Sequence, residues 1–454
     1  MAVLNKITLF DTFKENRWAA EFFNPKYVFA PTKKYKWVRI GSILKKCQYG
    51  LSISMNEDNH GYPIFRMNEI DNCFLTVAKK YANISFKEFK EYKLEIDDVI
   101  FNRTNSFEFV GRTGILKEDT DSVFASYLVR INPDKQYILP EFLTIYLNTP
   151  FGIGQTKRRA MHSINQANVS AAELKRIFIP LIDIPTQEDI AELVNNSFNL
   201  KKESEKLYNQ ATELLEQELG LDKFNLNESL NYTSTFFDII NSHRIDAQHY
   251  KPKFAQLIHH LKNHFKCVRI GTIASYNQRG VQPIYVEDGD INVITSQHIT
   301  NTHLKYDEFE KTSNDEFLTH PEANVKLGDI LIYTTGAYIG TTNPYLSNEK
   351  ALASNHVNIL KIKENIDTTY LALVLNTTIG KLQTEKYQRG SAQAELYPND
   401  IAKFIVPIID EMKMEKIGNL VKESLTKLNE AKQLIQQAKS KVEKLIEQAA
   451  KHYE

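Results

Sequence analysis

The sequence predicts an α+β protein in which two mixed α/β domains, related as an internal repeat, are separated by two long helices that form an antiparallel coiled coil. Three observations predict this fold. The second half of the chain restates the first, each copy combines short apolar strands with loops, and each copy is followed by a glycine-poor segment with a seven-residue apolar repeat. The predicted boundaries are 1–182 and 225–409 for the domains, and 183–224 and 410–454 for the spacer helices.

The composition is typical of a folded protein with more than one domain. A chain of 454 residues is longer than one hydrophobic core usually serves, and 42% hydrophobic with 25% charged residues is ordinary for globular proteins. The apolar runs are too short to span a membrane and the N-terminus lacks a signal-peptide pattern, so we expect a soluble, cytoplasmic protein. Cys47, Cys73 and Cys267 are not at metal or redox spacing, which argues against disulfide frameworks, zinc ribbons and iron–sulfur sites.

The internal repeat runs through the whole of each copy. Residues 8–11 match 235–238, 17–27 match 244–254, 38–43 match 268–273, 147–149 match 375–377, 177–183 match 404–410, and Ala125-Ser126 matches Ala353-Ser354. The offset stays between 227 and 230 residues. So many matches at a nearly constant offset indicate a duplication, and the poorly matching centre of each copy must hold what differs between the two.

Each copy reads as a mixed α/β domain. Runs rich in β-branched residues, at 38–43, 98–102, 122–131 and 292–295, are broken by Gly, Asn and Pro. Each copy then closes with an apolar strand that ends at a proline, 177–180 or 404–407, and a long helical segment follows.

The spacer segments carry heptad patterns. In the first, expected to be helical from about Thr186 to Leu221, the rows are Leu193, Leu200, Leu207, Leu214 and Leu221, and Ile190, Ser197, Ser204 and Ala211. In the second they are Val421, Leu428, Ile435 and Val442, and Ile417, Ser424, Ala431, Ala438 and Leu445. Such spacing over four or more heptads is typical of a coiled coil, and the intervening domain favours antiparallel pairing. The alternative, that each helix packs only on its own domain, accounts less well for the persistence of the repeat.

No catalytic or metal site is predicted. Gly152-Ile153-Gly154 lacks the third glycine and the later acidic residue of a dinucleotide site, and Asn343-Pro344-Tyr345 lacks a proline of the adenine methyltransferase motif, so we interpret it as a turn. No phosphate-binding loop of ATPases occurs. His259, His260 and His264 lack an intervening Glu and an obvious third ligand, and Glu287, Asp288 and Asp290 make no nuclease-like arrangement.

Two related domains on a rigid spacer suit a partner that is contacted at two places a fixed distance apart, and duplex DNA is such a partner. Proteins of two-fold symmetry read half-sites about 34–36 Å apart, and the first spacer helix would be of order 50 Å long. The net charge of zero argues against nucleic-acid binding, although residues 33–46 carry six Lys or Arg and no acidic residue.

The chain resembles the specificity subunits of type I restriction-modification systems. Residues 244–252 look like the opening of their recognition domains, residues 328–332 with Thr335-Gly336 and Ile339-Gly340 look like their strand-and-loop signature, and residues 179–190 resemble the entry to their spacer helix. The second copy departs from this pattern at 411–416, where proline and glutamine are missing, and residues 102–106 replace the glycine-bearing loop in the first.

The resemblance implies a non-catalytic subunit that binds a bipartite double-stranded DNA target, one half-site per target-recognition domain. It implies that this chain binds no cofactor itself. Partner modification subunits would use S-adenosylmethionine to methylate adenine in each half-site, and partner restriction subunits would use ATP and Mg to translocate and cut unmodified DNA.

Base readout needs donors and acceptors that can enter a groove, and the divergent loops offer them. The candidates in the first domain are Arg66, Asn68, Asn102, Arg103 and Asn105, with Lys157, Arg158 and Arg159 as phosphate contacts. Those in the second are Ser296, Gln297, Thr334, Thr335 and Tyr338, with Lys386, Tyr387 and Arg389. Two alternatives stay open: a free-standing two-site DNA-binding protein, and a coiled-coil scaffold that binds protein.

Overall fold

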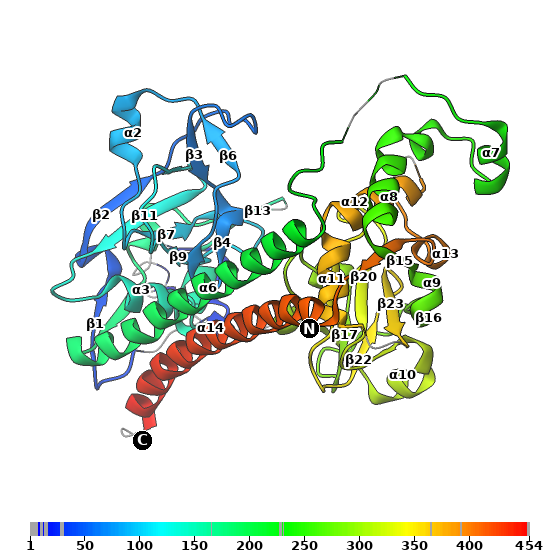
Figure 1. The fold of residues 1–454 in the computed structure, drawn as a ribbon. Helices are drawn as coiled ribbons and strands as arrows, with labels where there is room; N and C mark the ends of the chain where they lie inside the picture. The colour runs from blue at the N-terminus through cyan, green and yellow to red at the C-terminus, as the bar shows by residue number, and fades with distance from the viewer. Residues whose placement is uncertain are drawn as a thin grey trace. The chain divides into compact units, whose positions relative to one another are not determined.

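The computed structural model describes residues 8–9, 12, 17–27, 31–164, 166–226, 229, 231–363, 366–390 and 393–451, with the side chains of 449–451 omitted. It divides into two compact units (Figure 1), which are described separately: unit 1 comprises residues 1–202 and 428–454, and unit 2 comprises residues 203–427. Phe10 and Asp11 of the repeat, residues 1–7 of the first predicted domain and residues 452–454 of the second predicted spacer helix lie outside the described residues. Among the described residues no helix is both long enough and apolar enough to cross a membrane.

Unit 1 is built on small sheets. Strand β1 (Lys36–Arg39) pairs antiparallel with β14 (Phe178–Leu181). The largest sheet has the order β2 (Leu44–Tyr49), β11 (Leu128–Pro133), β7 (Val99–Asn102), β9 (Thr113–Ile115), β5 (Phe74–Leu75) and β4 (Ile70–Asp71). A third sheet has the order β10 (Val123–Phe124), β3 (Tyr62–Phe65) and β6 (Lys80–Ala82), and a fourth has the order β12 (Met161–Ser163), β13 (Gln166–Asn168) and β8 (Thr104–Asn105).

The helices of unit 1 lie mostly in its second half. They are α2 (Phe86–Tyr92), α3 (Pro140–Leu147), α4 (Pro150–Arg159), α5 (Ala171–Leu174) and part of α6 (Ile184–Glu218) and α14 (Glu411–Lys451). Short 3₁₀ helices occur at Ala20–Phe23, Pro25–Tyr27, Ile40–Ser42 and Met67–Glu69.

Unit 2 repeats this arrangement. Strand β15 (Lys266–Arg269) pairs with β24 (Ile405–Ile408); the central sheet has the order β16 (Ala274–Arg279), β23 (Val357–Ile362), β20 (Ile330–Tyr333) and β21 (Thr342–Pro344); and another has the order β18 (Glu310–Thr312), β17 (Ile291–Ile294), β22 (Ala351–Ala353) and β19 (Asn324–Val325). Its helices include α7 (Phe236–Ser242), α8 (Pro252–His264), α9 (Ile270–Ile273), α10 (Asn314–Thr319), α11 (Thr368–Asn376), α12 (Thr378–Tyr387) and α13 (Pro398–Ile401), with 3₁₀ helices at Ala247–Tyr250, Ser296–His298, Tyr306–Glu308 and Pro321–Ala323.

Two pairs of matched side chains show why the repeat was visible in the sequence. The Asn148 side chain pairs with the backbone of Thr113, since its amide donates to Thr113 O at 2.8 Å and its oxygen accepts from Thr113 N. Asn376 forms the same two bonds with Thr342. Buried backbone groups must find partners, and a side-chain amide supplies both a donor and an acceptor. The same side chain is therefore needed at the same place in both copies.

Strand pairing corrects one match. Gly50 lies so close to β10 that a Cβ on it would approach Phe124 O to 2.3 Å, and a Cβ on Gly280 would approach Ala353 O to 2.0 Å. Phe124 therefore corresponds to Ala353, and Ala125 corresponds to Ser354 rather than to Ala353. The offset in this segment is therefore one residue larger than the match of Ala125-Ser126 with Ala353-Ser354 suggested.

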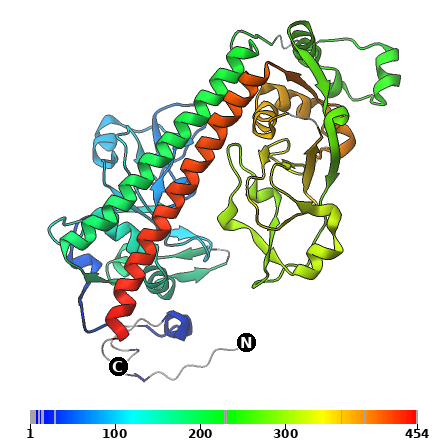
Figure 2. The same cartoon turned by 60° about the horizontal axis from the view of Figure 1, so that its bottom comes forward.

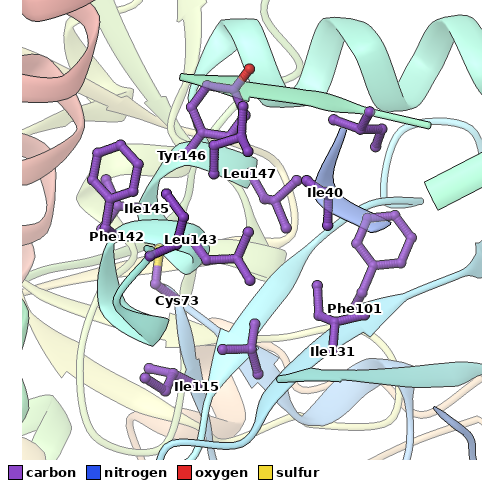
Figure 3. Packing of buried hydrophobic residues seen from close by; sticks show 14 of the residues in the cluster. Ile40, Cys73, Phe101, Ile115, Ile131, Phe142, Leu143, Ile145, Tyr146 and Leu147 are labelled. Atoms are coloured by element: carbon purple, nitrogen blue, oxygen red, sulfur yellow. The ribbon is translucent and has the colours of Figure 1, made fainter. Parts of the chain in front are cut away.

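The core of unit 1 lies between its central sheet and α3. Figure 3 shows Phe142, Leu143, Ile145, Tyr146 and Leu147 of α3 packed against Ile40, Cys73, Phe101, Ile115 and Ile131. The Tyr146 hydroxyl donates to Phe178 O at 2.7 Å, which satisfies the polar end of an otherwise apolar side chain.

In each unit α6 contacts α14. In unit 1, Ile190 and Val194 share a core with Ile435, Ala438 and Val442, and Ser197 Oγ donates to Ala431 O at 2.7 Å. In unit 2, Ala211 and Leu215 share a core with Ile417 and Val421, and Ser204 Oγ lies 3.1 Å from Ser424 Oγ. Figure 2 shows α6 in green and α14 in red.

The buried row of α6 differs from the leucine row that the heptads emphasised. Ile190, Ser197, Ser204 and Ala211 are buried, whereas Leu193, Leu200, Leu207 and Leu214 are only partly buried. Small Ser and Ala side chains let the helices approach closely, so the leucines lie at the edge of the contact.

Three expected elements also differ from the structure. Helix α6 ends at Glu218 because Gly220 has a φ of +62° and Leu221 N bonds to Glu216 O, which is a Schellman cap. Residues 38–43 are not one strand, since β1 ends at Arg39 and a 3₁₀ turn follows. Asn343-Pro344-Tyr345 is not a turn, because β21 pairs with β20 there.

Candidate nucleic-acid interface

In each unit three segments meet where strands end, and we call this the strand-end surface. In unit 1 it comprises residues 66–69, 103–105 and 125–127, and in unit 2 residues 295–298, 334–336 and 354–356. Backbone hydrogen bonds hold the segments together: Ala125 N donates to Phe65 O, and Arg103 N donates to Tyr127 O. The corresponding bonds of unit 2 are Ser354 N to Ile294 O and Thr334 N to His356 O.

The 3₁₀ helix at each strand end is capped from within. Glu69 accepts from Arg66 N at 2.7 Å, and His298 Nδ1 accepts from Thr295 N at 2.9 Å. This bond fixes the residue before the helix and leaves the middle of the turn facing outward. Asn68 and Gln297 occupy this middle position, and both are exposed.

Two arginines of unit 1 lie on the strand-end surface with their charge already engaged. Arg66 forms an ion pair with the buried Glu69 at 2.7 Å. Arg103 donates to Ser126 O at 3.2 Å and to Asn168 Oδ1 at 3.0 Å, and its guanidinium lies 4.9 Å from the centre of the Tyr49 ring. These contacts hold the planar donors in a fixed orientation, as bidentate recognition requires.

Of the candidate asparagines near Arg103, Asn102 is buried and Asn105 is half-buried. Asn102 is fully buried in β7, and its amide lies 3.4 Å from Phe109 O. Asn105 pairs with Ala167 in the sheet, and its Oδ1 accepts from Ser106 N. Both shape the loop that follows, and contact of either with DNA stays a prediction.

The basic run at the end of α4 is largely committed to unit 1 itself. Lys157 donates to the carbonyls of Phe107, Glu108 and Val110, and burial lowers the pKa of this amine to about 8. Arg158 donates to Phe22 O at 2.8 Å, and Arg159, 4% exposed, pairs with Glu173 at 3.1 Å. Of these three, only Lys157 and Arg158 keep partial exposure.

The candidates of unit 2 divide in the same way. Ser296 and Gln297 line a hollow of about 370 Å³, together with Thr295, Glu310, Asn355 and His356. Thr334 and Thr335 are buried, and Thr334 Oγ1 donates to His356 O. Tyr338 is 70% exposed and lies in the loop between β20 and β21.

The second basic group lies at the end of α12. Lys386 donates to His249 O at 3.3 Å, and burial together with the nearby Arg244 lowers its pKa. Tyr387 stacks on Phe404. Arg389 forms a bidentate pair with Asp400, at 2.9 and 3.1 Å, while half of its side chain stays exposed.

Sequence reasoning missed several residues that form the strand-end surfaces or contact them. Tyr49 and Asn168 hold Arg103, and Glu310, Asn355 and His356 line the hollow of unit 2. Gly50 and Gly280 were a usable signal, because a glycine at the same place in both copies marks a close backbone approach.

In the part of the chain that the structure describes, no group of three His, Cys, Asp or Glu side chains is arranged to hold a metal ion. The histidines of α8 have other contacts: His260 Nε2 lies 2.8 Å from Leu219 O, and His259 Nε2 lies 2.8 Å from the Asn263 amide.

Comparison with known families gives two matches along this chain. The family model of the type I restriction modification DNA specificity domain matches residues 32–213 and 263–443. These ranges are the two copies of the repeat, each with part of the helix that follows it. The resemblance stated from the sequence is thereby confirmed.

The chain is also similar to individual proteins named as subunits of type I restriction systems. The putative type I restriction enzyme MjaX specificity subunit of Methanocaldococcus jannaschii is 28% identical over 161 residues, 35% of this chain and 38% of that protein. The type I restriction enzyme EcoBI specificity subunit of Escherichia coli is 26% identical over 166 residues, 36% of this chain and 34% of that protein. The aligned stretches thus span little more than a third of either relative. The S subunit of a type I restriction-modification system from M. genitalium aligns with 93% of this chain and 99% of its own, at 13% identity and a TM-score of 0.45.

Proposed function

Because the chain belongs to the family of type I restriction modification DNA specificity domains, we propose that it is a specificity subunit whose two units each read one half of a bipartite duplex DNA target. The observation that carries this proposal is the strand-end surface, which recurs in both units with the same backbone hydrogen bonds and with different side chains. A common scaffold with variable side chains at one place is what two related readers of different base sequences require.

The exposed and partly exposed members of the strand-end surfaces are the strongest candidates for base contacts. Asn68 and Gln297 present amides, which pair best with adenine, and Arg103 presents a guanidinium, which pairs best with guanine. Asn102, which lies next to this surface, and its buried member Thr334 act by fixing the loops that carry the exposed residues. Arg158, Lys386 and Arg389, which are partly or fully exposed at the ends of α4 and α12, supply phosphate contacts.

The spacer in this proposal is an antiparallel coiled coil of α6 and α14. Its support is the order of the contacts, since rising numbers on α6 meet falling numbers on α14. Ser197 and Ser204 bond to the facing helix, and buried polar contacts of this kind fix the register of a helix pair.

The chain itself carries no catalysis in this proposal. Modification subunits that bind S-adenosylmethionine methylate adenine in each half-site, and restriction subunits that use ATP and Mg cut unmodified DNA. This chain binds none of these cofactors. It joins the subunits to their target in the cytoplasm.

The first prediction is that methylation of one bipartite motif depends on this chain. Methylated adenines would be mapped across the genome in cells with the gene, without it, and with a plasmid copy restored. One motif with two specific halves and a fixed spacing should disappear on deletion and return with the plasmid. An unchanged methylation map, together with tight sequence-specific binding by the purified chain alone, would instead indicate a free-standing DNA-binding protein.

Salt dependence separates the proposal from a protein-binding scaffold. Neutralisation of several phosphates makes the affinity for DNA fall steeply as salt rises. The affinity of the purified complex for duplex DNA would be measured between about 50 and 200 mM salt, a range over which phosphate contacts cause a large loss of affinity. A flat response would contradict DNA binding.

A further inference from the structure

The strand-end surface of unit 2 contains a hollow of about 370 Å³ whose lining is polar and partly unsatisfied. Ser354, 2% exposed, lines it, and its Oγ has no hydrogen-bond partner among the described residues. The same holds for Oδ1 of its neighbour Asn355. Buried polar atoms without partners are costly, and here they belong to residues that line the hollow, so the lining suits a polar ligand.

Glu310, on β18, is an acidic residue that lines this hollow. Within the described part of unit 2, Glu310 forms no ion pair or side-chain hydrogen bond. The neighbouring lysines are engaged elsewhere, because Lys311 donates to Asn292 Oδ1 at 2.8 Å and Lys305 pairs with Glu308 at 2.8 Å. The carboxylate is therefore available as an acceptor.

Strand register identifies the residue of unit 1 at the same place. Glu310 lies opposite Val293 of β17, and Lys80 lies opposite Ile64 of β3. Val293 and Ile64 are themselves equivalent, since each pairs in parallel with the matching residue of β22 or β10. The position thus holds a cation in unit 1, where Lys80 pairs with Glu57 at 3.1 Å, and an anion in unit 2.

At two more positions, a cationic side chain of unit 1 is replaced by an uncharged one in unit 2. Thr295 starts the capped turn in unit 2 where Arg66 starts it in unit 1. Thr334 N donates to the turn in unit 2 where Arg103 N does so in unit 1. At these three positions unit 1 therefore carries cationic side chains, whereas unit 2 carries one carboxylate and two hydroxyls.

A carboxylate on a DNA-reading surface repels phosphates and lowers affinity unless it meets a donor. The donors on base edges in the major groove are the exocyclic amino groups, N4 of cytosine and N6 of adenine, and Glu is an acceptor for the cytosine group. We infer that Glu310 accepts a hydrogen bond from the exocyclic amino group of one base, cytosine or adenine, in the half-site read by unit 2. This inference rests on the proposed function.

The experiment combines a protein change with a base change. Duplexes bound by the full chain, with any modification subunit that co-purifies, are first selected from a random library to define both half-sites. Affinities of the wild type and Glu310→Gln are then measured on the selected duplex and on duplexes in which the amino group of a single cytosine or adenine has been removed. Glu287→Gln, an exposed glutamate of the same unit outside the hollow, is the matched control.

The expected result is a coupling at one base of the second half-site. Removal of its amino group should weaken wild-type and Glu287→Gln binding by about tenfold or more, and should change Glu310→Gln binding by less than about twofold, since the charged acceptor is already gone. Equal losses for all three proteins at every base would overturn the inference and leave the proposed function standing. Failure of the wild type to select any motif would overturn both.

Discussion

Asp400 shows how single charged residues hold the candidate surface of unit 2. The side chain is fully buried and accepts from Arg389 at 2.9 and 3.1 Å and from Lys403 at 2.8 Å. Burial by itself raises the pKa of this carboxyl, but hydrogen bonds from Arg389 and Lys403 outweigh it and hold the pKa below its usual value. Arg389 is fixed in orientation by this pair while its exposed half faces solvent.

The lowered pKa gives unit 2 a pH dependence. A carboxyl whose pKa is lower in the folded state contributes stability above its unfolded pKa of about 4, and this contribution is lost as the pH falls through the folded pKa. We expect Asp400→Asn to lower the stability of unit 2 at neutral pH and to flatten its decline under acid. Urea unfolding between about pH 2 and 7 would measure this, with the exposed Asp288→Asn as the control. An acid decline as steep in Asp400→Asn as in the wild type would contradict the assignment.

Individual site residues were only partly predictable from the sequence. Asn68 and Gln297 were predicted independently, because divergent polar residues after a strand indicate an exposed loop. They occupy equivalent positions in the capped turns of the two units. Asn102 was selected for the same reason and is buried, since the direction of a side chain at a strand end depends on the turn that follows. Lys80 and Glu310 were missed, because only strand pairing reveals that they are equivalent.

At the scale of elements, one glutamine in each unit joins a helix to the closing strand. Gln155 of α4 donates to Phe178 O at 2.9 Å and accepts from Phe178 N at 2.8 Å. Gln383 of α12 makes the same two bonds with Ile405. In each unit the amide thus pairs with backbone groups of the closing strand that would otherwise lack partners.

Replacing either glutamine should loosen one closing strand and leave the other unchanged. Gln155→Leu leaves Phe178 N without a partner, which costs about 1–3 kcal/mol, and should speed hydrogen exchange in β14 alone. Gln383→Leu should do so in β24 alone. Exchange mass spectrometry would measure both strands in each variant, with Gln436→Leu on the exposed face of α14 as the control. Equal effects of one substitution on both strands would show that the units are not independent.

The long helices were predictable as elements, but not in their details. The heptads located α6 and α14 because apolar spacing dominates helix burial. They overextended α6 to Leu221, although Gly220 carries the signal for its end. Residues 411–416 lack the glutamine of the family pattern, and Met414 of this segment is buried in the core of unit 2. In unit 1 the glutamine is present as Gln187, and its amide donates to Tyr137 O and Ile182 O.

At the scale of the whole molecule, the proposed function predicts that the coiled coil of α6 and α14 sets the distance between half-sites. Helices α6 and α14 pass from one unit to the other at residues 202–203 and 427–428. Four residues added to both helices at these points lengthen each by about 6 Å, which corresponds to roughly two base pairs. We expect the methylated motif to keep both halves and to gain one or two base pairs between them.

Single insertions are the controls for this prediction. Four residues in α6 alone would displace it along α14, so the Ser197 and Ser204 contacts could not both persist, and the protein should be destabilised. Methylation mapping and thermal unfolding of the three variants would distinguish the outcomes. A folded, active double variant with the original spacing would contradict the spacer model.

The division of unit 1 into two stretches of chain affects how it is made. Its core includes Ile435, Ala438 and Val442 of α14, which leave the ribosome only after residues 203–427 have been synthesised. At about 5–20 residues per second, this interval lasts roughly 10 to 45 seconds. Until then, Ile190 and Val194 of the nascent chain lack their partners, and an amphipathic helix with an open apolar stripe is a surface that chaperones bind. Translation that stops before α14 therefore leaves both copies of the repeat incomplete.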